Sequence, residues 1–118
     1  MSLFRKGDFT LNSGQKSRFK IDCDALSDSD LDALAAWISP WLKPFGSVIP
    51  IPTGGDAFAA ALSAYVSDGP PLIVDDVLTT GRSMERVRSE LNEWAQGIVI
   101  FARTKPPEWI TAIWTREG

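Results

Sequence analysis

The sequence predicts an α/β fold, with a mainly parallel, twisted sheet and helices on both of its faces. From residue 46 onward, short apolar runs alternate with segments of helical spacing, and turns rich in Gly, Pro and Thr separate them. Strands that alternate with helices form βαβ units with right-handed crossovers. The length of 118 residues fits one domain. We therefore expect a single domain over 1–118, in which 1–24 form an N-terminal hairpin region and 46–118 form the βαβ core.

The N-terminal region reads as a β-hairpin. Asp8–Leu11 and Phe19–Asp22 have the composition of short strands, and the Asn12–Gly14 segment between them has the composition of a turn.

A helix is expected to begin at Asp28–Asp30, with Ser29 as its N-cap, because acidic residues favour the positive end of the helix dipole. Pro40 is expected to kink this helix, and Pro44 with Gly46 to end it. Five apolar residues recur at helical spacing and form its predicted buried face: Leu31, Leu34, Ala35, Ile38 and Leu42.

The remaining segments supply the predicted βαβ units. In order they are a strand at Val48–Ile51, a turn at 52–55, a helix at Ala57–Tyr65, a turn at 68–71, a strand from Leu72, a helix from Ser83 to about Ala95, and strands at Ile98–Ala102 and Ile110–Trp114. Ligands of parallel sheets bind at the carboxyl ends of the strands. Three turns are expected at that edge: Pro52–Asp56, Asp75–Ser83 and Arg103–Thr104.

Composition excludes several classes of function. Nucleic-acid-binding domains are usually basic, so the net charge of −3 argues against this class of function. No apolar run approaches the length that crosses a membrane. Without histidine there is no Ser-His-Asp triad, no Cys-His pair and no His-ligated zinc. The single Cys23 permits no internal disulfide and is expected to be a small buried hydrophobe. With no signal peptide at the start, these features predict a cytoplasmic protein.

The most informative segment runs from Leu72 to Ser83. A buried apolar strand ends in the adjacent carboxylates Asp75 and Asp76, and a Thr-Thr-Gly turn leads into the next helix. Amide groups at a helix N-terminus bind phosphate, and carboxylates accept hydrogen bonds from sugar hydroxyls or hold a hard cation. The alternative is a plain capped helix, but adjacent aspartates repel each other and capping needs no such pair.

This segment resembles the phosphoribosyl-pyrophosphate (PRPP) motif of type I phosphoribosyltransferases, which has four apolar residues, two acids and a Thr-Gly-x-Ser turn. The resemblance implies that Asp75 and Asp76 are the catalytic pair, contact the ribose, and bind Mg²⁺ directly or through PRPP and water. It also implies that five residues of the turn hold the 5′-phosphate: Thr79, Thr80, Gly81, Arg82 and Ser83. Arg82 stands where a small residue is common in the family.

Two further segments are similar to parts of the same family. Thr53, Gly54 and Gly55 resemble the pyrophosphate loop, where successive amides form an anion nest; alone, they would also fit a plain strand-to-helix turn. Residues 9–19 are similar to the N-terminal region of orotate phosphoribosyltransferases, which implies that Lys16 and Phe19 help to bind the base, as would Arg103 after its strand. The basic residues Lys16, Arg18 and Lys20 would neutralise an anionic base or pyrophosphate. The alternative for residues 9–19 is a solvated hairpin in which Phe19 is a core aromatic. The alternative for Arg103 is an ordinary surface arginine.

The sequence departs from the family between Gly55 and Leu72. Orotate-type enzymes have a long basic, mobile loop there, whereas this segment has no Lys, Arg or His. Two hypotheses remain. The favoured one is a compact, Mg²⁺-dependent transferase that moves the phosphoribosyl group of PRPP to a pyrimidine-like or other nitrogenous base; the other is a non-catalytic sensor of PRPP or nucleotides.

The expected partners are small molecules and a second copy of the chain. The resemblance implies a homodimer, because family members usually work as homodimers. Five tryptophans are many for 118 residues and are expected in the core or at a subunit interface: Trp37, Trp41, Trp94, Trp109 and Trp114.

Overall fold

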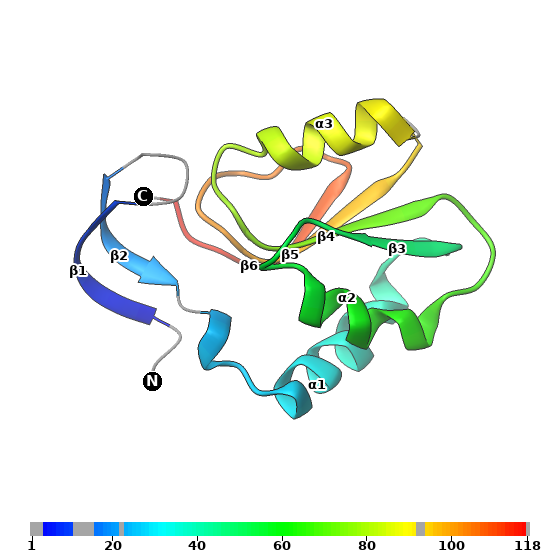
Figure 1. Ribbon diagram of the computed structural model, residues 1–118, viewed down its shortest axis with the longest axis horizontal. Helices are drawn as coiled ribbons and strands as arrows, with labels where there is room; N and C mark the ends of the chain where they lie inside the picture. Colours follow the sequence, from blue (N-terminus) through cyan, green and yellow to red (C-terminus); the bar gives the residue numbers. More distant parts are fainter. Residues whose placement is uncertain (1–3, 11–15, 22, 92–93, 118) are drawn as a thin grey trace.

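The computed structural model describes residues 4–10, 16–21, 23–91 and 94–117, and Figure 1 shows their arrangement. The strands are β1 Phe4–Thr10, β2 Lys16–Ile21, β3 Ser47–Pro50, β4 Pro71–Leu78, β5 Gln96–Ala102 and β6 Ile110–Thr115. The helices are α1 Asp28–Ile38, α2 Asp56–Leu62 and α3 Arg82–Leu91. Short 3₁₀ turns lie at Cys23–Ala25, Ser39–Trp41 and Ser63–Tyr65.

Four strands form one parallel sheet in the order β3-β4-β5-β6. The sheet lies between two helical layers: α1 and α2 cover one face, and α3 covers the other (Figure 1). The predicted α/β class, with helices on both faces of a parallel sheet, is confirmed.

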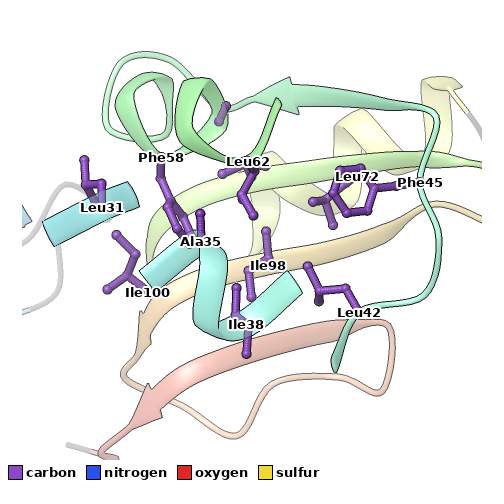
Figure 2. Close-up of a cluster of buried hydrophobic side chains, with 12 residues drawn as sticks. Leu31, Ala35, Ile38, Leu42, Phe45, Phe58, Leu62, Leu72, Ile98 and Ile100 are labelled. Carbon is purple, nitrogen blue, oxygen red and sulfur yellow. The ribbon is translucent and has the colours of Figure 1, made fainter. Parts of the chain in front are cut away.

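Each face of the sheet has its own hydrophobic layer. Figure 2 shows the layer beneath α1 and α2, which includes Phe58 and Leu62 of α2 and Leu72 of β4. On the other face Met84 of α3 packs against Ile73 and other residues of the central strands. Burial of each large apolar side chain contributes roughly 1.5–3 kcal/mol. The alternation of β4 side chains between the two layers explains its continuous apolar run, Leu72–Val74.

Helix α1 buries Leu31, Ala35 and Ile38 of the predicted face, whereas Leu34 is half-buried and Leu42 follows the 3₁₀ turn after the helix. The helix begins with a different cap from the predicted one. The Ser27 hydroxyl accepts a hydrogen bond from the Asp30 N–H at 3.1 Å, and the Asp30 carboxylate accepts one from the Ser27 N–H at 2.9 Å. This reciprocal pair is a capping box, so the prediction of Ser29 as N-cap is wrong. Pro40 lies within the 3₁₀ turn that follows Ile38, so the helix ends before Pro40 and is not kinked there.

Several boundaries also differ from the predicted ones. The hairpin strands are longer than predicted, and Leu11 and Asp22 lie outside the described residues. Helix α3 ends at Leu91, before the predicted Ala95. Ala95 is buried against the α3 layer, and Gln96 already pairs with Leu72 of β4, so the chain must be extended at that point.

Beta strands β1 and β2 form a separate antiparallel pair, called here the N-terminal ribbon. In Figure 1 it stands beside the sheet, on the side toward which the carboxyl ends of the parallel strands point.

The tryptophans are mostly outside the core. Trp41 and Trp94 are 76% and 79% exposed, and Trp37 and Trp114 are 58% and 45% exposed. Trp109 is half-buried beside α3, where its indole N–H donates to Glu85 at 3.2 Å and its ring lies 4.7 Å from the Arg88 guanidinium carbon. The expectation that the tryptophans lie in the core is therefore wrong for these four exposed residues. Cys23 is half-buried against the α1 layer, so it is less buried than expected.

None of the helices in the described ranges is both long enough and apolar enough to cross a membrane.

Candidate functional site

The three predicted turns meet at the carboxyl edge of the sheet. Parallel pairing of β3 with β4 and of β4 with β5 puts the ends of these strands side by side. Two hydrogen bonds continue the pairing into the turns: the Ile51 N–H donates to the Val74 carbonyl oxygen at 2.8 Å, and the Arg103 N–H donates to the Leu78 carbonyl oxygen at 2.9 Å. The pairing thus holds the start of each turn at a fixed position.

Asp75 and Asp76 occupy the last part of β4, and both are half-buried. Successive strand residues point to opposite faces, so the two carboxylates are presented on different sides of the strand. Each carboxylate is oriented by the next amide: the Asp76 N–H donates to Asp75 Oδ1 at 2.8 Å, and the Val77 N–H donates to Asp76 Oδ1 at 2.7 Å. The two acids thus keep defined positions and retain access to solvent.

The environment of Asp75 favours its protonated form. Burial, and then the hydrogen bond and negative charge of Asp76, raise the pKa of Asp75 to about 8, against its ordinary value of 3.8. The Asp76 N–H acts in the opposite direction but is a smaller effect. A cation or several hydrogen-bond donors arriving at Asp75 would favour the ionised form, so ligand binding at this carboxyl is coupled to proton release.

The Asp76 carboxylate lies against Gly54 of the turn after β3. A Cβ atom added to Gly54 would come within 2.6 Å of Asp76 Oδ2 and 2.7 Å of Asp76 Oδ1. Real Cβ atoms do not approach other atoms so closely, so residue 54 has to be glycine for the carboxylate to stay where it is. The structure therefore brings together the predicted ribose-binding acid and the predicted pyrophosphate loop.

The rest of that loop is tightly folded. The peptide bond between Pro52 and Thr53 is cis. The Gly55 N–H donates to the Ile51 carbonyl oxygen at 2.9 Å, so this amide is already paired within the turn. A side chain at Gly55 would collide with the Val74 carbonyl oxygen of β4. Thr53 and Gly54 are exposed and Gly55 is buried, so an approaching ligand would meet the first two.

The turn after β4 leads into α3 as predicted, one residue earlier than expected. Gly81 has a φ of +77°, in the left-handed region that favours glycine, and its carbonyl oxygen accepts the first helical bond from the Glu85 N–H at 2.9 Å. The first amides of a helix have no partner within the helix and can bind an anion. Thr79 is half-buried, while Thr80, Arg82 and Ser83 are exposed.

Arg103 follows β5 at the same edge and is only 7% exposed. Burial lowers the pKa of its guanidinium below its usual range. The alternative of an ordinary surface arginine is therefore wrong for Arg103. Lys105, two residues further on, is exposed and adds a cation near this edge. Lys105 is absent from the predicted site residues, although its place directly after the Arg103–Thr104 turn was a usable signal.

The two predicted base-site residues of the hairpin lie in β2. Lys16 is paired with Thr10, and Phe19 with Lys6, across the N-terminal ribbon. The described part of the structure includes their backbone only, so a contact between these side chains and Arg103 stays a prediction.

The acid pair has the carboxylate oxygens that Mg²⁺ prefers as ligands. Among the described residues, no group of three or more His, Cys, Asp or Glu side chains is arranged to hold a metal. Mg²⁺ is usually held by one or two carboxylates, substrate phosphates and water. Asp75 and Asp76 have the carboxylate chemistry that such a site requires, and a phosphorylated ligand would have to supply further oxygens.

No family model matches the sequence, and no curated protein matches it. Among solved structures, the chain is similar to orotate phosphoribosyltransferase from Aeropyrum pernix, with a TM-score of 0.72 and 24% identity over 96% of this chain and 88% of that chain. It is also similar to the Francisella tularensis enzyme (TM-score 0.64, 15% identity, covering 96% and 80% of the two chains). The Mycobacterium tuberculosis enzyme, in complex with inorganic phosphate, gives a TM-score of 0.62 and 15% identity, covering 94% and 87%.

These similarities cover most of the chain and establish its fold. The protein has the fold of type I phosphoribosyltransferases, in its orotate phosphoribosyltransferase-like form.

Proposed function

We propose that the protein binds PRPP together with Mg²⁺ and transfers the phosphoribosyl group to a pyrimidine-like or other nitrogenous base, releasing pyrophosphate. The contact between Asp76 and Gly54 is the observation that carries this proposal. It joins a carboxylate suited to ribose hydroxyls to a loop that resembles a pyrophosphate loop, at the sheet edge where ligands of parallel sheets bind.

Different residues bind different parts of PRPP. Asp75 and Asp76 accept hydrogen bonds from the ribose hydroxyls, and the turn from Thr79 to Ser83 takes the 5′-phosphate at the start of α3. Hydrogen bonds to a charged group are each worth about 1.5–3 kcal/mol, so a few of them suffice to hold the phosphate. Thr53, Gly54 and Gly55 flank the diphosphate, with the Gly55 amide already engaged in the turn.

In the reaction the bond between the anomeric carbon and the diphosphate oxygen breaks, and its electron pair leaves with pyrophosphate. A nitrogen of the base forms the new bond to the same carbon. Asp75 and Asp76, together with the ligand, would hold Mg²⁺, which would neutralise negative charge on the diphosphate. Firm binding of the 5′-phosphate keeps the anomeric carbon in line with the base.

The base is expected between the N-terminal ribbon and β5. Arg103 offers a planar guanidinium with several donors, which suits a carboxylate or a paired carbonyl and ring nitrogen. Phe19 would stack on a flat ring, and Lys16 would neutralise an anionic base. We expect Arg103→Lys to weaken base binding more than PRPP binding, because lysine keeps the charge and loses the planar fork.

A second candidate function is a non-catalytic sensor of PRPP or nucleotides. One observation favours it: α2 leads through a 3₁₀ turn at Ser63–Tyr65 directly to β4, and the residues from 56 to 70 contain no cation. No basic segment is therefore present there to close over the site and exclude water.

Two measurements on the purified chain separate these functions. Calorimetry with PRPP, with and without Mg²⁺, tests binding, and release of pyrophosphate in the presence of a panel of bases tests transfer. The enzyme predicts base-dependent release. Tight PRPP binding with no base-dependent release would support the sensor. Absence of PRPP binding would refute the enzyme, and absence of both PRPP and nucleotide binding would refute the sensor as well. Asp75→Asn with Asp76→Asn should abolish binding while the circular dichroism spectrum is unchanged.

We also infer a homodimer in the cytoplasm, where Cys23 would stay reduced. The exposed Trp37 and Trp41, on α1 and the following 3₁₀ turn, offer an aromatic surface of the kind enriched at interfaces. Sedimentation velocity of the native chain and of Trp37→Ser with Trp41→Ser tests the dimer, which should dissociate in the variant.

A further inference from the structure

The exposed large apolar side chains of the described residues gather at one end of the molecule. Six of these seven lie on segments at the amino end of the parallel sheet, whereas Trp114 lies near the carboxyl end of β6. In Figure 1 the end of α1, the end of α3 and the connection from α2 to β4 all lie at the end opposite the N-terminal ribbon. The six residues are called here the amino-end surface: Trp37, Trp41, Tyr65, Val66, Leu91 and Trp94.

Hydrogen bonds of the Gln96 side chain join the segments that carry the two most exposed tryptophans. The Lys43 N–H donates to Gln96 Oε1 at 3.2 Å, and the Gln96 side-chain amide donates back to the Lys43 carbonyl oxygen. Trp41 precedes Lys43 by two residues, and Trp94 precedes Gln96 by two residues. The two tryptophans therefore flank a single fixed contact between the segment after α1 and the start of β5.

The connection from α2 to β4, which carries Tyr65 and Val66, is bonded to the same segment after α1. The Ser67 N–H donates to the Phe45 carbonyl oxygen at 2.8 Å, and the Phe45 side chain is buried in the layer beneath α1 and α2. The backbone that presents the amino-end surface is thus fixed by contacts within the chain. A partner that binds there would pay little for ordering it.

The amino-end surface is large enough for a protein interface. Trp37, Trp41 and Trp94 are 58%, 76% and 79% exposed. An aromatic side chain has about 150–250 Å² to bury, so these three alone present on the order of 400 Å² to solvent. That is about half of the roughly 800 Å² that each partner contributes to an interface of standard size. Tryptophan is also enriched among the residues that carry most of the binding energy of interfaces.

The charges beside this surface suit a second copy of the chain. Lys43, Asp68 and Glu90 are exposed, and each lies within two residues of a member of the amino-end surface. In a two-fold dimer every contact occurs twice with the partners exchanged, so a surface that carries both signs of charge can pair with itself. Anionic lipid surfaces attract clusters of basic residues, and two acids with one cation do not form such a cluster.

We propose that the amino-end surface binds the same surface of a second copy of this chain in a two-fold dimer. The inference rests on the homodimer proposed above and assigns its interface. The candidate site lies at the carboxyl end of the sheet, so the two ligand sites of this dimer lie at its opposite ends, and each site is built from one copy alone.

Sedimentation velocity over a range of chain concentrations tests this interface. The double variant Leu91→Ser with Trp94→Ser removes the part of the surface at the end of α3 and leaves the tryptophans of α1 and its 3₁₀ turn in place. Trp114→Ser is the matched control, because it removes an exposed tryptophan outside the amino-end surface. Lys43→Glu keeps every apolar side chain and makes the three neighbouring charges all negative. Circular dichroism checks that each variant is folded, and calorimetry measures its affinity for PRPP.

We expect the double variant to raise the dissociation constant of the dimer by about tenfold or more. Lys43→Glu should also raise it, and by less at high salt, because salt screens the repulsion between like charges. Trp114→Ser should keep the native dissociation constant. The PRPP affinity of the double variant should stay within about twofold of the native one, because the ligand site lies at the other end of the sheet.

A double variant that dimerises as tightly as the native chain would overturn the inference, as would an equal weakening by Trp114→Ser or a loss of PRPP affinity on dissociation. If the double variant fails to fold, an unchanged dimer in Lys43→Glu would overturn it. A native chain that stays monomeric would also overturn it, and PRPP binding by that monomer would leave the proposed function standing. A native dimer that binds no PRPP would overturn the proposed function alone.

Discussion

The Asp76 carboxylate fills the space that a side chain at Gly54 would occupy, with a separation of 2.6 Å between Asp76 Oδ2 and the nearest possible Cβ position. Two residues from different βα turns thus depend on each other. The carboxylate can take its position only because residue 54 has no side chain, and the loop can approach the strand only because of the same absence. Substitution of Gly54 therefore tests the site without removing any polar group.

We expect Gly54→Ala to displace the Asp76 carboxylate and to weaken PRPP binding at least tenfold, with little change in melting temperature because residue 54 is exposed. Calorimetry and thermal unfolding measure the two effects. Gly55→Ala is the matched comparison: its Cβ would collide with the Val74 carbonyl oxygen, so this variant should lose stability. Native PRPP affinity in Gly54→Ala would show that the Asp76 position is unimportant for binding.

The raised pKa of Asp75 predicts that stability depends on pH. Above its ordinary pKa of 3.8 the unfolded chain has released this proton, while the folded chain keeps it up to about pH 8. The proton that the folded chain retains on Asp75 therefore stabilises the fold fully below about pH 4. This stabilisation is lost as the pH rises from 4 to 8, by at most about 1.4 kcal/mol per pH unit. Urea unfolding at several pH values measures the slope.

In Asp75→Asn this part of the pH dependence should disappear, because asparagine does not titrate. The control is Asp68→Asn, which replaces an exposed acid in the turn before β4 and should keep the native profile. If the unfolding free energies of the native chain and of Asp75→Asn changed with pH in the same way, the assignment of this pH dependence to Asp75 would be contradicted.

Gly81 offers a test of the phosphate turn. Its φ of +77° costs a residue with a Cβ atom roughly 1–2 kcal/mol, and a β-branched residue adapts least well. We expect Gly81→Val to lower the melting temperature and to abolish binding of ribose 5-phosphate. Asparagine tolerates this conformation better, so Gly81→Asn should keep a higher melting temperature and more of the ribose 5-phosphate binding than Gly81→Val. If Gly81→Val binds ribose 5-phosphate normally, the 5′-phosphate lies elsewhere.

The start of α1 gives a prediction independent of function. Loss of the Ser27 hydroxyl removes half of the capping box, and we expect Ser27→Ala to cost about 1 kcal/mol of unfolding free energy. Ser29→Ala, at the N-cap position predicted from the sequence, should cost less, since the Asp30 amide is bonded to the Ser27 hydroxyl and the Ser29 hydroxyl pairs with that same hydroxyl at 3.1 Å. Equal losses in the two variants would argue against Ser27 as the cap.

The pattern of apolar runs was enough to predict the parallel sheet, its two helical layers and the strand that carries Asp75 and Asp76. Such patterns depend on burial and periodicity, which are local properties of the chain. The choice between Ser27 and Ser29 was harder, because both hydroxyls lie within one turn and only the backbone geometry separates them. The end of α3 was misplaced because pairing of Gln96 with Leu72, a long-range contact, decides where the chain becomes extended.

The candidate site could be predicted in its residues but not in its contacts. Asp76 and Gly54 were both selected from their own motifs, yet nothing in the sequence indicated that one fits against the other. The burial of Arg103 was likewise beyond prediction, because it depends on the packing of segments distant in sequence. A compact α2 connection, in contrast, followed directly from the short segment between Gly55 and Leu72.

Strand β4 pairs with a neighbour on each side and lies between two helical layers, so its amide hydrogens should be among the slowest in the molecule to exchange with deuterium. The acids near its end therefore stand on the part of the chain that opens last. Local fraying elsewhere would leave their spacing intact, and exchange at β4 would report unfolding of the whole domain.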